Sequence, residues 1–182
     1  ACGPTLSHEC GTNLYQNGVC YLFNGQLQHI ARYPSRTQDC FTARVDLALL
    51  IDGSGSIVPS DFTLIKEFIL HMFQRYRHRD VQFAVMQYSD LVKKEFNFEE
   101  YELSNRNESL VQKIRQLTGD TYTPTAIKQL VEEIFVEESG LRSNSKRVMV
   151  VITDGKSNDP DTTFSEAIRL AQDKHILRFA VG

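Results

Sequence analysis

One short loop carries residues whose types and spacing suit the binding of a hard divalent cation. Asp52, Ser54 and Ser56 occupy alternate positions, and Gly53 and Gly55 separate them. Carboxylate and hydroxyl oxygens are the ligands that Mg²⁺ prefers, and glycines let the backbone curve so that the three side chains converge. The loop therefore predicts a metal site, with the ordinary role of serines in turns and helix caps as the alternative.

The segment before this loop predicts a buried central strand. Residues 45–51 are an almost unbroken apolar run, too short to span a membrane, that ends at Asp52. A second run of this kind, at 146–153, ends at Asp154. In a parallel sheet, ligands bind beyond the carboxyl ends of the strands. We therefore expect the two aspartates to meet at one crevice, although a hundred residues separate them.

The rest of this region alternates helical and strand patterns. Apolar residues recur at helical spacing over 62–76, 127–135 and 164–171, and further strands are expected at 81–88 and 176–181. Residues 93–98 predict an edge strand with one wet face, and a short helix is expected around 110–117. Pro124 fits the first turn of a longer helix that ends at Gly140. The fold class is α/β, a doubly wound, mostly parallel sheet.

The first 43 residues differ from the rest. All four cysteines of the chain, Cys2, Cys10, Cys20 and Cys40, fall there without the CxxC and histidine pattern of a zinc site. Their even number in a loop-rich stretch predicts two disulfides and an extracellular setting, with three pairings open. A strand is expected at 18–23 with a turn after it, and the remainder as loop and linker. Two domains follow, 1–43 and 44–182.

Charge and hydropathy exclude other classes. The 182 residues carry a net charge of −3, which gives no reason to expect nucleic acid as a partner. The chain shows neither a spanning apolar run nor a secretory leader, so it is expected to be mature or part of a longer chain.

Three motifs in order carry a family resemblance. The run from Asp52 to Ser56, then Thr121 within 119–123, then Asp154 with Gly155 resemble the metal-ion-dependent adhesion site of von Willebrand factor A domains. More narrowly, the whole chain resembles the inserted domain of a leukocyte integrin α subunit together with the piece of β-propeller before it. By that resemblance the chain is expected to be truncated at its C-terminus, without the last strand and helix of the domain.

The resemblance implies roles for the site residues. Ser54 and Ser56 would be direct ligands of Mg²⁺, with Mn²⁺ or Ca²⁺ as alternatives, and Asp52 and Asp154 would act largely through metal-bound waters. Thr121 would join the ligands in the high-affinity state, with its neighbour Thr123 as the competing choice. An acidic side chain of a protein ligand would take the vacant coordination position.

The resemblance also implies partners and a location. Only five residues separate Gly140 from Lys146, which leaves no room for the extra helix of collagen-binding integrins and favours the leukocyte type. The implied partners are the leukocyte β subunit and ligands such as intercellular adhesion molecules, complement fragments or fibrinogen. The chain would be the extracellular part of a plasma-membrane receptor, attached to the membrane only through segments absent from this chain.

Two further modifications are expected. The resemblance pairs Cys2 with Cys20 and Cys10 with Cys40. Independently of it, Asn107 opens an Asn-Glu-Ser sequence, which is an acceptor site for N-glycosylation in a polar stretch.

Two other classes compete with this interpretation. A Mg²⁺-dependent phosphohydrolase of doubly wound fold would use Asp52 as nucleophile beside Asp154. Ser54 stands where a second acid would be expected, and no motif places a lysine or histidine, so we predict that the chain is not an enzyme. A secreted or matrix A-domain protein outside the integrins is the nearer rival, and the cysteine segment argues against it.

Overall fold

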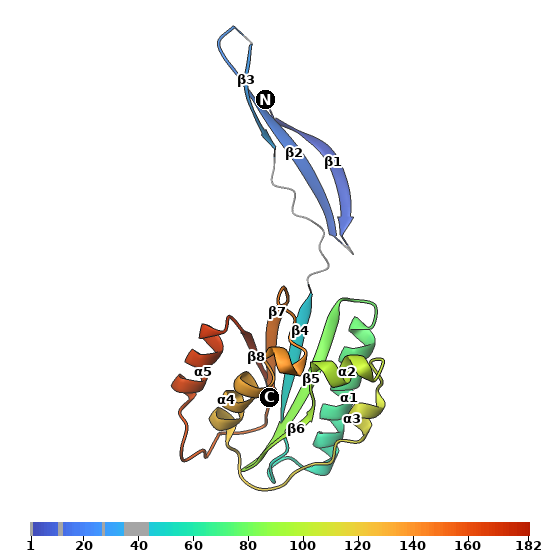
Figure 1. The fold of residues 1–182 in the computed structure, drawn as a ribbon, viewed down its shortest axis with the longest axis vertical. Coiled ribbons are helices and arrows are strands. Elements are labelled where there is room, and N and C mark those ends of the chain that lie inside the picture. The colour runs from blue at the N-terminus through green and yellow to red at the C-terminus, as the bar shows by residue number, and fades with distance from the viewer. Residues whose placement is uncertain (1, 11–12, 27, 35–43) are drawn as a thin grey trace. The chain divides into compact units, whose positions relative to one another are not determined.

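The computed structural model describes residues 2–10, 13–26, 28–34 and 44–182, and it divides the chain into two compact units, 1–42 and 43–182 (Figure 1). Within the described ranges, no helix combines the length and apolar character needed to cross a membrane.

The N-terminal unit is a three-stranded antiparallel sheet in the order β1-β2-β3. The strand expected at 18–23 forms the second half of β2, and the turn after it is held by the Asn24 side chain, whose oxygen accepts from the backbone N–H groups of Gln26 and Gln28. The expectation of loop is wrong for residues 2–10, 13–17 and 29–34, where pairing between strands satisfies the backbone although the sequence lacks a clear apolar alternation. The linker expected at 35–43 lies outside the described residues. The strands are β1 (Cys2–Cys10), β2 (Asn13–Phe23) and β3 (His29–Pro34).

The cysteine predictions fall partly within the described residues. Cys20 is disulfide-bonded, and the register of the sheet sets Cys2 opposite it. Cys40, the expected partner of Cys10, lies outside the described residues. The two pairings therefore stay predictions.

The second unit is built on a five-stranded sheet in the order β6-β5-β4-β7-β8, which confirms the predicted fold class. The apolar run before the site loop is the central strand β4, paired in parallel with β5 on one side and β7 on the other. Only β6 is antiparallel to its neighbour among these strands, as its wet-edge pattern indicated. The strands are β4 (Val45–Asp52), β5 (Val81–Tyr88), β6 (Val92–Phe96), β7 (Lys146–Ile152) and β8 (Leu177–Val181).

Side chains that alternate along β4 build two separate cores. Leu47, Leu49 and Ile51 face α1 and α3, whereas Ala48 and Leu50 face α4 and α5 (Figure 1). The central strand is thus covered on both faces, which fixes its register and the position of the loop that follows it. The helices are α1 (Pro59–Tyr76), α2 (Phe98–Leu103), α3 (Ser109–Gln112), α4 (Thr123–Glu133) and α5 (Phe164–Asp173).

Three expected boundaries are wrong. The short helix expected around 110–117 is α3, which ends at Gln112. The edge strand ends at Phe96, because Asn97 and Glu100 form a capping box that starts α2, a helix the aromatic alternation concealed. The longer helix does begin around Pro124 but ends at Glu133. Gly140 instead ends the short 3₁₀ helix η1 (Glu137–Ser139), in a left-handed conformation with φ of 83°.

The amino ends of the strands carry a partly buried ionic network. Asp46, fully buried, accepts hydrogen bonds from the backbone N–H and the Nε–H of Arg142 at 2.9 and 2.8 Å. The Arg142 guanidinium also contacts Asp80 and donates to the Val45 carbonyl at 3.0 Å. This network ties the 141–145 connection, which contains no helix, to the end of the sheet remote from the site loop.

Candidate metal-binding site

The carboxyl ends of β4 and β7 bring three predicted residues together. The hydroxyl oxygens of Ser54 and Ser56 lie 3.0 Å apart, and the Ser56 hydroxyl donates to Oδ1 of Asp154 at 3.1 Å. Ser54 is fully buried, whereas Ser56 and Asp154 are exposed. A chain of oxygen atoms therefore runs from the interior of the loop to its surface.

Asp52 lies beneath these residues and is fully buried. Its Oδ1 accepts from the backbone N–H of Ser54 at 2.9 Å, and its Oδ2 accepts from the hydroxyls of Thr153 at 2.7 Å and Tyr88 at 3.4 Å. Burial of a carboxylate requires such compensation. Both oxygens of Asp52 are thus engaged with the protein, and the residue fixes the turn that presents Ser54.

Tyr88 links Asp52 to Thr123. The two hydroxyl oxygens of Tyr88 and Thr123 are 3.2 Å apart, and both residues are buried. Burial raises the pKa of Tyr88 to about 12, so its hydroxyl keeps its proton at neutral pH and can donate to Asp52. Because the Thr123 hydroxyl already has this partner, it is less available to a cation than that of Thr121.

Thr121 sits in a neighbouring loop whose backbone is held firmly. Its N–H donates to Oδ1 of Asn158 at 2.8 Å, and its carbonyl accepts from the N–H of Asn158 at 3.0 Å and from the Ser157 hydroxyl at 2.8 Å. The loops are joined where the Gly55 N–H donates to the Gly119 carbonyl at 2.9 Å. The Thr121 hydroxyl itself makes no hydrogen bond to any residue that the structure describes.

The two glycines of the site loop differ in whether a larger residue would fit. A Cβ at Gly53 would come within 2.1 Å of Oε1 of Gln87, a buried side chain that accepts from the Leu117 N–H at 2.7 Å. A Cβ at Gly55 would meet the Gly119 backbone at ordinary distances, 3.5 Å from its carbonyl oxygen and 3.8 Å from its nitrogen. Glycine is therefore required at position 53 because the Gln87 side chain of β5 approaches closely, not because the backbone is left-handed.

The donor set fits a small hard cation. Neighbouring ligands of an octahedral Mg²⁺, each bound at about 2.0–2.1 Å, lie about 3 Å from one another, which is close to the measured separation of the two serine hydroxyls. Within the described part of the chain, no group of three or more His, Cys, Asp or Glu side chains is arranged to hold a metal. The cluster combines hydroxyls with carboxylates instead, as the sequence predicts.

Several supporting residues were not predicted. Thr153 and Tyr88 hold Asp52, Asn158 holds the Thr121 loop, and the Gln116 amide donates to the Ile57 carbonyl at 2.7 Å after the site loop. Only Thr153 had a signal in the sequence, as a hydroxyl directly before Asp154 at the end of a buried strand.

Comparison with known proteins places this geometry in a family. The model of the von Willebrand factor type A domain matches residues 46–182, which include the whole oxygen-rich cluster. This chain belongs to the von Willebrand factor type A domain family.

Relatives of this family member extend the similarity to the N-terminal unit. This chain is 35% identical over 182 residues to integrin alpha-X of Mus musculus and 38% identical over 182 residues to integrin alpha-D of Homo sapiens. Each comparison covers 100% of this chain. The chain spans only 16% of the length of either relative. The similarity to integrin α subunits confirms the predicted resemblance and the prediction that the chain is not an enzyme.

Solved structures agree on the fold. Proximal thread matrix protein 1 from the mussel byssus, with a zinc-occupied MIDAS motif, superposes with a TM-score of 0.71 at 21% identity, over 77% of this chain and 38% of that one. At this identity the match supports the A-domain fold, and the metal belongs to the mussel protein.

Proposed function

We propose that this von Willebrand factor type A domain is the ligand-binding domain of a cell adhesion receptor and works through a divalent cation. The observation that carries the proposal is the convergence of Ser54, Ser56 and Asp154 within hydrogen-bonding distance at the ends of two parallel strands. Mg²⁺ is the proposed ion, because the serine oxygens have the spacing of adjacent octahedral ligands, with Mn²⁺ or Ca²⁺ as alternatives.

The residues of the cluster would have different roles around the cation. Ser54 and Ser56 would contribute their hydroxyl oxygens directly. Asp52 would not bind the ion directly, because three protein donors already hydrogen-bond to its carboxylate. Asp154, exposed and bonded only to Ser56 among the described residues, would orient that hydroxyl and hold ordered water. With few charges among the direct ligands, the bound ion would retain affinity for an outside carboxylate.

Thr121 is the proposed additional ligand. Its hydroxyl has no described partner, whereas that of Thr123 is bonded to Tyr88. The Thr121 N–H donates to Asn158 and the Ser157 hydroxyl donates to the Thr121 carbonyl, and these bonds hold the backbone of Thr121 beside the site loop.

The proposed biological setting follows from the relatives. As in an integrin α subunit, this domain would pair with a β subunit of the leukocyte type and stand outside the cell, with membrane attachment through segments not in this chain. The helix-free 141–145 connection supports the leukocyte type over the collagen-binding type. Proposed ligands are intercellular adhesion molecules, complement fragments and fibrinogen, each bound through an acidic side chain.

Asn107 is the proposed glycosylation site. It is exposed, and its side-chain oxygen accepts from the N–H of Ser109 at 2.8 Å, in a turn on the surface of the domain. Asn107 also lines a pocket between the end of α1 and the loop after α2, so a carbohydrate there would stand beside that pocket.

Binding to immobilised fibrinogen, an intercellular adhesion molecule and a complement fragment tests this function. We expect at least one to bind in Mg²⁺, and the binding to disappear in EDTA and in Asp154→Ala. Asp173→Ala is the matched control, because it removes an exposed aspartate at the end of α5 and should bind normally. Binding that survives EDTA, or equal binding by Asp154→Ala and the parent, would contradict the proposal.

A further inference from the structure

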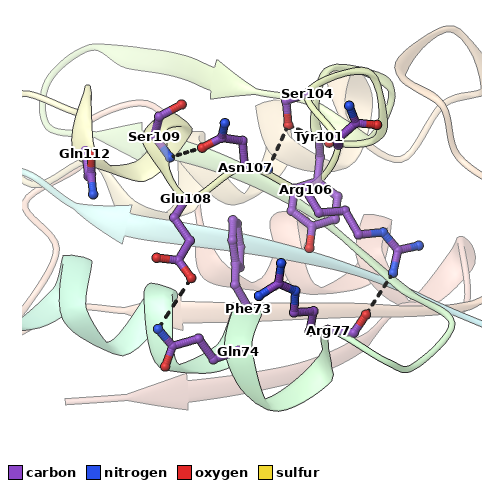
Figure 2. Close-up of a pocket in the computed structure, with 11 residues that line it drawn as sticks. Phe73, Gln74, Arg77, Tyr101, Ser104, Arg106, Asn107, Glu108, Ser109 and Gln112 are labelled. Carbon is purple, nitrogen blue, oxygen red and sulfur yellow. Dashed lines mark hydrogen bonds between the residues drawn. The ribbon is translucent and has the colours of Figure 1, made fainter.

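A second candidate site lies away from the metal cluster, in a pocket between the end of α1 and the loop that follows α2 (Figure 2). The pocket has a volume of about 490 Å³. Phe73 and Arg77 form one wall, and Tyr101, Arg106 and Glu108 contribute to the others. None of these residues takes part in the cation cluster.

The floor of the pocket contains a hydroxyl group without a protein partner. Tyr101 is 1% exposed, and its ring packs edge-on against Phe73 with centroids 4.9 Å apart. Its hydroxyl lines the pocket and makes no hydrogen bond to any residue within the described ranges. Burial raises the pKa of Tyr101 to about 12, so the group is a proton donor at neutral pH. Every fully buried side-chain nitrogen and oxygen among the described residues has a hydrogen-bond partner, so this hydroxyl is open to water in the pocket. A ligand oxygen would replace that water as its acceptor.

The two arginines of the pocket differ in availability. Each nitrogen of the Arg106 guanidinium already has a protein partner, because Arg106 pairs with Glu102 at 3.0 Å and donates to the carbonyls of residues 77 and 79. Arg77 is exposed and has no side-chain hydrogen bond or ion pair to a described residue. Its positive charge acts on Tyr101, and Figure 2 shows its guanidinium turned toward the Tyr101 hydroxyl. One free guanidinium and one free hydroxyl therefore face the same space.

These donors select a carboxylate. A guanidinium and a phenol can donate to the two oxygens of one carboxylate, and bonds of this charge-assisted kind are strong. Glu108 lines the same pocket, and among the described residues its side chain is bonded only to the Gln74 amide, at 3.4 Å. Its negative charge repels any anion, but a singly charged carboxylate less than a doubly charged sulfate or phosphate. The apolar body of the ligand would touch the small exposed parts of Phe73 and Tyr101, which are 3% and 1% exposed.

The walls of the pocket are formed before any ligand binds. Asn105 and Arg106 both have positive φ, 57° and 59°, which turns the loop back toward α1. The bonds of Arg106 to the end of α1 and of the Ser104 hydroxyl to the Tyr101 carbonyl at 2.7 Å hold this shape. The backbone around the pocket therefore needs little ordering on binding, whereas the exposed Arg77 side chain must be ordered.

We propose that this pocket binds a small monocarboxylate with an apolar body, its carboxylate accepting hydrogen bonds from Arg77 and Tyr101. The site is independent of the divalent cation and of the adhesion function proposed above.

Benzoate is the probe, with benzamide as its uncharged analogue, followed by NMR of the 182-residue chain in EDTA. Working without divalent ions removes any binding of the carboxylate at the cation cluster. We expect benzoate to shift resonances of Phe73, Arg77 and Tyr101 saturably, with a Kd on the order of millimolar for so small a ligand. Benzamide should cause no comparable shifts. The Ser54→Ala, Ser56→Ala double variant should bind benzoate like the parent.

Two conservative variants test the residues. Arg77→Gln and Tyr101→Phe should each weaken benzoate binding by about tenfold, the loss expected when one bond to a charged group is removed. Tyr101→Phe should keep the parent's melting temperature, because the hydroxyl has no described protein partner. Arg75→Gln, which removes an exposed arginine from the same helix outside the pocket, is the matched control and should bind normally. Absence of saturable shifts, or equal affinity in the parent and both variants, would overturn the proposal.

Discussion

The two aspartates of the cation cluster should differ in what they contribute to stability. Asp52→Ala removes the acceptor of three hydrogen bonds, from the Ser54 N–H and from the Thr153 and Tyr88 hydroxyls. Bonds to a charged group contribute about 1.5–3 kcal/mol each. The Tyr88 hydroxyl keeps Thr123 as a partner, and the variant no longer buries a carboxylate. We therefore expect a net loss of about 2–4 kcal/mol in the free energy of unfolding.

Asp154→Ala should leave the fold nearly unchanged. Asp154 is exposed and accepts only from the exposed Ser56 hydroxyl among the described residues, so its removal should cost about 0.5 kcal/mol or less. Both variants should lose Mg²⁺ binding. Urea unfolding of the parent and both variants in EDTA, followed by circular dichroism, measures the difference. Equal destabilisation by the two substitutions, or collapse of the spectrum in Asp154→Ala, would refute the division of roles.

Two other predictions rest on the same structure. Gly53→Ala should lower the free energy of unfolding by roughly 1–3 kcal/mol, measured by urea unfolding, because its Cβ would displace the buried Gln87 amide. Gly55→Ala should stay within about 0.5 kcal/mol of the parent. Equal effects of the two substitutions would contradict the steric argument. Burial raises the pKa of Asp80, but the hydrogen bond and charge of Arg142 outweigh it and hold that pKa below its ordinary value of 3.8. The pairing with Arg142 stabilises the fold above pH 3.8, and this stabilisation is lost as the pH falls through the lower pKa that Asp80 has in the folded state. The urea midpoint of Asp80→Asn should therefore depend less on pH below about 4 than that of the parent. Parallel pH profiles of the two proteins would exclude this role.

The position of the site could be predicted from the sequence, because the site lies where two buried strands end. Two buried apolar runs that each end in an aspartate specify adjacent parallel strands, and the structure brings Asp154 to the loop that follows Asp52. The supporting contacts were not predictable, because they depend on register. Tyr88 reaches Asp52 only because the pairing of β4 with β5 sets these two residues side by side.

The boundary errors have a similar origin. Phe96 and Phe98 continue one alternating pattern, yet Phe98 begins a helix and its side chain packs into the other core, whereas Tyr101 of that helix packs into the same core as Phe96. Ile134 and Phe135 continue the apolar stripe of α4 beyond its end, because both remain buried in the same core after the helix stops at Glu133. Burial sets the apolar spacing in both segments, whereas capping and backbone hydrogen bonds set the element ends.

Calorimetric titration of Mg²⁺ into the metal-free chain tests the central claim most directly. The parent is compared with the Ser54→Ala, Ser56→Ala double variant and with a Ser60→Ala, Ser143→Ala control, in which two exposed serines outside the cluster are replaced. We predict saturable binding in the parent and the control and none in the Ser54, Ser56 variant. Equal binding by all three proteins, or binding by none of them, would contradict the assignment of these hydroxyls as cation ligands.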